Sequence, residues 1–116
     1  MKRLNWLLLT MMCLLISCTK SNNDDTDDPT ADCATTAKAF VANVNPIIKN
    51  TCTDALCHGT GSINGPGSLL TYNSIFAARA TIRTVIANGT MPKNSSLSTA
   101  QKNTILCWID GGAPNN

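Results

Sequence analysis

The segment Cys52-Thr53-Asp54-Ala55-Leu56-Cys57-His58 is the most informative part of this 116-residue chain, because it places two thiols beside an imidazole. Four residues separate the cysteines, and His58 directly follows the second one. His58 is also the only histidine of the chain. Chance rarely places a lone histidine there, so we interpret the segment as a binding site.

Two thiols followed by a histidine are typical of covalent haem attachment, in which the cysteines form thioethers and the histidine ligates iron. The usual pattern has two residues between the cysteines, so this segment is a longer variant. It predicts that Cys52, Cys57 and His58 hold haem. Two alternatives stay open: a haem-free binding protein in which the same cysteines form a disulfide, and a zinc site built from cysteines and His58, whose spacing differs from that of structural zinc modules.

The N-terminus predicts export. Two basic residues precede an apolar run over residues 4–16, which is shorter than the roughly 20 residues that span a bilayer. Leu15-Ile16-Ser17-Cys18 resembles the lipobox of bacterial lipoproteins. We therefore expect a signal peptide over residues 1–17 and a lipid on Cys18; the alternative is an ordinary secretory signal or a retained anchor. The mature chain would be lipid-anchored in a bacterial cell envelope, on the periplasmic or cell-surface side of the outer membrane.

Residues 18–32 are polar, with several aspartates against the single Lys20, and predict a disordered acidic tether. Residues 33–116 then form one small domain, in which basic residues outnumber acidic ones. This positive charge is compatible with attraction of an acidic redox partner, or with a soluble surface that has no role in attracting a partner. Nothing in the chain indicates that it binds nucleic acid.

Export also changes how the cysteines are counted, because thiols outside the cytoplasm oxidise unless something else occupies them. Cys13 would leave with the signal peptide, and Cys18 would carry lipid. The four remaining cysteines allow three disulfide pairings. If haem occupies the two cysteines beside the histidine, Cys33 and Cys107 are left to form a disulfide.

Three amphipathic segments predict helices, and no segment alternates as a strand does, so the fold class is all-α. The first covers residues 41–50, with Pro46 in its first turns. The second covers residues 72–88 and ends at Gly89, with a possible break near its middle. The third begins at the capping box Ser98-Thr99-Ala100-Gln101 and ends before Gly111.

Haem iron ligated by His58 needs a sixth ligand if it is to pass electrons without binding small molecules. Met91 is the only methionine left once the signal peptide is removed. It follows the end of the second predicted helix, and Pro92 restricts the backbone beside it. We predict that Met91 is the second axial ligand, where its thioether would raise the reduction potential. The alternative is a methionine that fills a gap on an apolar surface.

Residues 40–114 resemble small bacterial c-type cytochrome domains, which are found on lipoproteins or fused to larger secreted enzymes. The resemblance lies in a set of landmarks along the whole domain: Phe40, Val44-Asn45-Pro46-Ile47-Ile48, Cys52 to His58, Leu70-Thr71-Tyr72, the stretch from Ile86 to Pro92, and the stretch from Ile105 to Pro114.

The resemblance implies a cytochrome c-like helical domain wrapped around one covalent haem c. Cys52 and Cys57 would form the thioethers, and His58 and Met91 would ligate the iron. The implied function is that of a monohaem electron carrier and not of an enzyme, since no residue set for peroxide cleavage stands out. Arg79 and Arg83, one helical turn apart, are either partners of the haem propionates or part of a solvated helix face.

Overall fold

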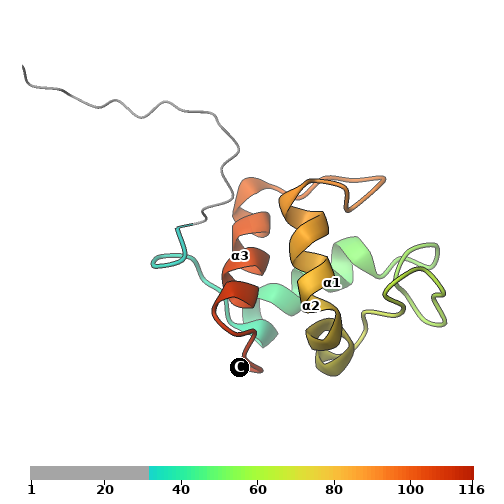
Figure 1. Ribbon diagram of the computed structural model, residues 1–116, viewed down its shortest axis with the longest axis horizontal. Helices are drawn as coiled ribbons and strands as arrows, with labels where there is room; N and C mark the ends of the chain where they lie inside the picture. The colour runs from blue at the N-terminus through green and yellow to red at the C-terminus, as the bar shows by residue number, and fades with distance from the viewer. Residues whose placement is uncertain (1–31) are drawn as a thin grey trace, which may run out of the picture.

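The computed structural model describes residues 32–116, and in this part the chain forms helices and no strand, as an all-α fold requires. The elements are the short π-helix η1 (Phe40–Val44) and the α-helices α1 (Asn45–Cys52), α2 (Tyr72–Ala87) and α3 (Thr99–Asp110) (Figure 1). None of these helices is long and apolar enough to cross a membrane. The predicted signal peptide, the lipid on Cys18 and the tether up to residue 31 lie outside the described residues.

The first predicted helix is divided between η1 and α1, with Pro46 in the first turn of α1. Proline has no N–H, and its ring crowds the carbonyl one turn earlier, so a regular α-helix cannot run through this point. The backbone widens instead, and the N–H of Val44 donates to the Ala39 carbonyl 3.2 Å away. Asn116 supplies acceptors for the start of η1: its side chain accepts from the Phe40 N–H at 2.9 Å, and its carbonyl from the Val41 N–H at 2.8 Å.

The predicted start of α3 is confirmed, because the Ser98 hydroxyl accepts from the Gln101 N–H at 3.2 Å and the Gln101 side chain accepts from the Ser98 N–H at 2.9 Å. Thr71 and Ser74 form the same reciprocal pair at the start of α2. That second box was not predicted, since serine stands where glutamate or glutamine is usual. Helix α2 runs without a break to Ala87, and Gly89 follows it with a φ of 72°.

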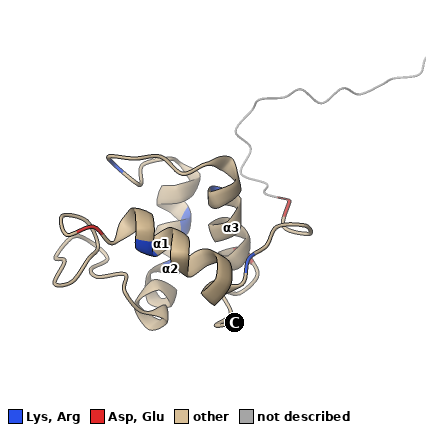
Figure 2. Ribbon diagram, turned by 180° about the vertical axis from the view of Figure 1, so that it is seen from behind, with Lys and Arg blue, Asp and Glu red and all other residues tan. Residues whose placement is uncertain are grey.

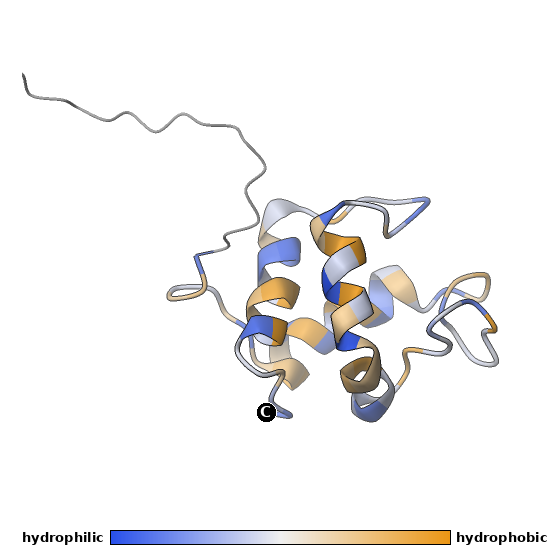
Figure 3. Cartoon of the chain, viewed as in Figure 1, coloured by the Kyte–Doolittle hydropathy of each residue, from blue (hydrophilic) through white to orange (hydrophobic). Residues whose placement is uncertain are grey.

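Helix α3 forms the centre of the core and packs against both α2 and η1. The residues that the four helices bury are all apolar, and they alternate with hydrophilic residues along the helices (Figure 3). The Phe40 ring lies between Tyr72 and Trp108, at centroid distances of 5.0 and 5.4 Å. Two polar groups of this cluster fold the C-terminal segment back over it: the Trp108 indole N–H donates to the Pro114 carbonyl and the Tyr72 hydroxyl to the Ala113 carbonyl, both at 2.9 Å.

A disulfide joins Cys33 to Cys107, the pairing expected if haem occupies the other two cysteines. Its partners are 74 residues apart in sequence, and Cys107 is buried in α3. The bond therefore ties the start of the described chain to the helix at the centre of the core.

Candidate functional site

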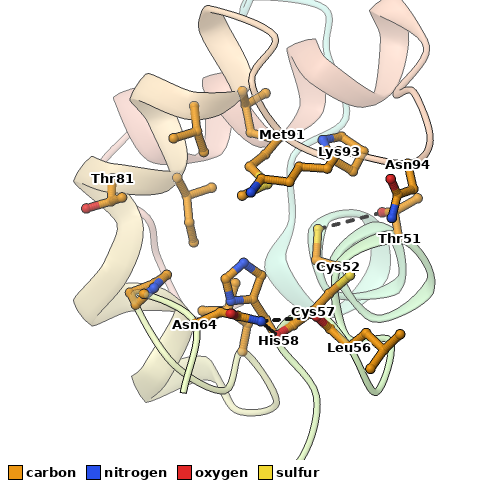
Figure 4. Close-up of a pocket in the computed structure, with 17 residues that line it drawn as sticks. Thr51, Cys52, Leu56, Cys57, His58, Asn64, Thr81, Met91, Lys93 and Asn94 are labelled. Atoms are coloured by element: carbon orange, nitrogen blue, oxygen red, sulfur yellow. Dashed lines mark hydrogen bonds between the residues drawn. The ribbon is translucent and has the colours of Figure 1, made fainter. Parts of the chain in front are cut away.

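A cavity of about 360 Å³ lies between the end of α1, the loop after it, helix α2 and the loop that precedes α3 (Figure 4). Its volume is within the range of small-molecule sites. The cavity brings together the four residues that the sequence predicted as a haem site: Cys52, Cys57, His58 and Met91. The remaining lining residues are mostly apolar: Leu56, Gly65, Pro66, Leu69, Ile82, Val85, Ile86 and Pro92, with Thr51, Asn64, Thr81, Lys93 and Asn94.

His58 is 8% exposed, and both its ring and its backbone are fixed. Its Nδ1 lies 3.0 Å from the Gly67 carbonyl, which only accepts, so Nδ1 carries a proton, and in the neutral imidazole Nε2 keeps its lone pair. The His58 N–H donates to the Cys52 carbonyl, and its carbonyl accepts from the Leu69 N–H, both at 2.9 Å. The ring points into the cavity from the side opposite Met91 (Figure 4). An imidazole held this way is prepared to ligate a metal through Nε2.

The four residues between the cysteines form a tight turn at the edge of the cavity, which Leu56 also lines. The Asp54 carbonyl accepts from the Cys57 N–H at 2.9 Å and from the Gly59 N–H at 3.2 Å. Leu56, at the tip of this turn, is 90% exposed. The turn absorbs the longer gap and leaves both thiols on the same side of the cavity. Only glycine fits at position 59, because a Cβ there would lie 2.7 Å from the Thr53 carbonyl oxygen.

A glycine in a loop can let a ligand approach the backbone closely, or let the chain approach itself. At Gly59 the close neighbour is the chain's own backbone, at Thr53 and Asp54. The residue lets the loop close on itself, because the turn between the cysteines occupies the space of a side chain.

Cys52 and Cys57 are free thiols. Burial raises the pKa of the Cys52 thiol above its ordinary value; a hydrogen bond with Thr51 opposes this rise, and the neighbouring Cys57 adds to it. Cys52 therefore stays a neutral thiol at neutral pH, which suits its place on an apolar wall.

Met91 reaches the cavity because the chain reverses direction after α2. Asn88 ends the helix, Gly89 takes the positive φ, and the Asn88 side chain accepts from the Thr90 N–H at 3.0 Å. The Met91 N–H then donates to the Val85 carbonyl at 3.1 Å, which fixes the residue beside the last turn of α2. The Met91 side chain lines the cavity opposite His58.

The two arginines considered as partners of haem propionates do not line the cavity. Arg83 forms a two-pronged ion pair with Asp110, at 2.6 and 3.0 Å. Arg79 donates to the Phe76 carbonyl at 2.7 Å, and its guanidinium lies over the Phe76 ring, 4.0 Å from the centroid. Sequence reasoning missed Lys93, the one charged residue among those that line the cavity. The sequence signal that could have identified Lys93 is its position two residues after Met91.

The charged residues of the domain are few and scattered over its surface (Figure 2). Within residues 32–116, no three His, Cys, Asp or Glu side chains are grouped so that they could hold a metal ion. The zinc alternative therefore receives no support from this part of the chain.

No protein family, no curated protein and no solved structure matches this chain.

Proposed function

We propose that the domain is a monohaem c-type cytochrome, an electron carrier with a cytochrome c-like fold in the bacterial cell envelope. The observation that carries the proposal is the meeting of four groups at one apolar cavity. These are the two free thiols of Cys52 and Cys57, the Nε2 lone pair of His58, and the Met91 thioether opposite it. Thioether attachment needs the first two groups, and axial ligation of haem iron needs the others.

The cavity lining fits haem in its chemistry as well as in its ligands. The lining contains no carboxylate, and apolar side chains such as Leu69, Ile82 and Ile86 form much of its wall. Such a wall excludes water and so limits the reorganisation that slows electron transfer. When bound, haem would supply an iron that exchanges one electron between its ferric and ferrous states.

The chain's own residues would orient the iron ligands and tune them. The Gly67 carbonyl accepts the Nδ1 proton of His58, which fixes the ring and makes Nε2 a stronger donor. The soft sulfur of Met91 favours ferrous iron and raises the reduction potential relative to a second imidazole. Neither residue takes part in a substrate reaction, so the proposed protein is not an enzyme.

In this proposal residues 1–17 direct export, Cys18 carries the lipid that anchors the protein to the membrane, and the domain exchanges electrons with protein partners. The Cys33–Cys107 disulfide is compatible with haem at the other two cysteines. A haem-free binding lipoprotein stapled by disulfides would contain the same bond, so the experiment has to test the haem itself.

The test is to express the full chain in cells that mature c-type cytochromes, then to record visible spectra and to stain a denaturing gel for haem. We expect haem that survives denaturation, together with the far-red band of a ferric iron bound by a thioether. Met91→Leu should keep the covalent haem and lose that band, whereas Ile63→Leu, at a position that is 99% exposed, should keep both. A colourless protein with all its cysteines oxidised would instead indicate the haem-free binding lipoprotein.

A further inference from the structure

Residues 59–68 fold back over the Cys57–His58 segment and contact it through several hydrogen bonds. The Ser62 hydroxyl donates to the Cys57 carbonyl. Within the loop, the Ser68 hydroxyl donates to the Gly59 carbonyl at 2.7 Å and so holds its two ends together. The Gly67 carbonyl orients the His58 ring. The loop of residues 59–68, called the clasp below, therefore holds the residues that carry the second thiol and the imidazole.

Asn64 connects the two sides of this clasp. Its side-chain amide donates to the Leu56 carbonyl at 3.1 Å and to the Cys57 carbonyl at 2.9 Å. The backbone carbonyl of Asn64 accepts from the N–H of Gly67, the residue whose own carbonyl orients His58. One residue thus joins the backbone of the second cysteine to the group that fixes the imidazole.

The turn between the cysteines has little else to fix its outer part. Leu56 is 90% exposed and has no apolar anchor in the core. On the inner side, the N–H groups of Cys57 and Gly59 donate to the Asp54 carbonyl. On the outer side, the carbonyls of Leu56 and Cys57 are bonded by Asn64, and that of Cys57 also by Ser62.

We propose that Asn64 is a positioning residue for haem attachment: its amide fixes the turn between the cysteines so that the Cys57 thiol and the His58 imidazole face the cavity together. This inference rests on the proposed function. The sequence marked Asn64 only as part of a turn, and a turn needs its backbone. The proposal concerns its side chain, which donates to two carbonyls that precede it by seven and eight residues.

The test uses Asn64→Asp, which keeps the size and shape of the side chain but replaces its donor group by an oxygen that repels carbonyls. Asn115→Asp is the matched control, because Asn115 is also exposed and receives the same charge, but lies outside the cavity lining. Both variants and the parent are made as full chains in cells that mature c-type cytochromes. Mass spectrometry after thiol alkylation then shows whether Cys57 carries a thioether or a free thiol.

We expect the ratio of thioether to free thiol at Cys57 to fall at least about fivefold in Asn64→Asp, because losing one hydrogen bond of typical net strength has that effect and the variant loses two. The reduced α band should move to longer wavelength, because a vinyl group left unattached extends the conjugation of the ring. Asn115→Asp should match the parent. Equal thioether content in all three chains, with unshifted bands, would overturn the role of Asn64 and leave the proposed function standing.

Hydrogen exchange separates failure of this inference from failure of the proposed function. In full chains made without haem, Asn64→Asp should speed exchange of the Cys57 and His58 amides at least about fivefold relative to Asn115→Asp. Unchanged exchange rates would overturn the proposed role of Asn64, whether or not the parent binds haem. If Asn64→Asp fails to fold, Ser62→Ala replaces it in the test, because it removes the other donor to the Cys57 carbonyl. Ser62→Ala should also lower the thioether content at Cys57. An unchanged thioether content would overturn the proposal.

Discussion

The Cys33–Cys107 disulfide gives the clearest prediction about stability. Cys33→Ser breaks the bond at its half-buried end, so no cavity opens in the core. Cys107 is 1% exposed in α3 and would remain as a small apolar side chain. The substitution therefore isolates the effect of the covalent link from that of core packing.

The expected effect follows from the length of the loop that the bond closes. Its two cysteines are 74 residues apart, and closing a loop of that length restricts the unfolded chain by about 4.5 kcal/mol at 25 °C in the chain-entropy account. For a domain of this size, each kcal/mol shifts Tm by roughly 4–8 °C. We therefore expect Cys33→Ser to lower Tm by roughly 20 °C or more.

The assay is thermal and urea unfolding followed by circular dichroism, which give Tm and the free energy of unfolding. It compares the parent, Cys33→Ser and the control Ala37→Ser, an exposed position in the same segment. A thiol reductant should destabilise the parent to the level of Cys33→Ser and leave that variant unchanged, because it cleaves disulfides and not thioethers. A difference below about 1 kcal/mol between parent and variant would refute the reasoning, since the loop would then not be closed by this bond.

Three further predictions concern the α3 cap, the buried thiol and the lysine at the cavity. Ser98→Ala removes the capping acceptor of α3 and should cost about 1 kcal/mol in urea unfolding; unchanged stability would show that the box contributes nothing. In the chain without haem, Cys52 should be alkylated more slowly than Cys57 near neutral pH. Because the folded pKa of Cys52 is raised, its contribution to stability should be full below the ordinary thiol value of 9.0 and be lost as pH rises through the folded pKa. Equal alkylation rates, and a free energy of unfolding that does not fall at alkaline pH, would contradict the burial argument. Lys93→Gln should lower the reduction potential in a redox titration more than Lys102→Gln does, because losing a positive charge beside the cavity favours ferric iron; equal potentials would contradict this placement.

Helices α2 and α3 could be predicted from sequence because their signals are local. The apolar period, the capping box at Ser98 and the glycine at position 89 act within a few residues of one another. The π-turn of η1 could not be predicted in the same way. It depends on Pro46 and on acceptors from Asn116, which is 76 residues from Phe40 in sequence.

The candidate site shows the same difference between residues with local sequence signals and residues whose roles depend on the folded chain. The residue types of the four proposed haem contacts stand in recognisable motifs, so sequence reasoning selected them, and the structure brings them to one cavity. The roles of Asn64 and Lys93 depend on how the loops close in three dimensions, and the one local signal was the position of Lys93 two residues after Met91. Arg79 and Arg83 lie one helical turn apart, but their partners are Phe76 and Asp110, away from the cavity lining.

The most direct test of the central claim is the intact mass of the full chain, purified from cells that mature c-type cytochromes and measured after unfolding in the presence of a thiol-alkylating reagent. The account predicts the mass of the processed chain with its lipid on Cys18 plus one haem, and no alkyl group on Cys52 or Cys57. A mass without haem, with these two cysteines joined to each other or alkylated, would contradict it.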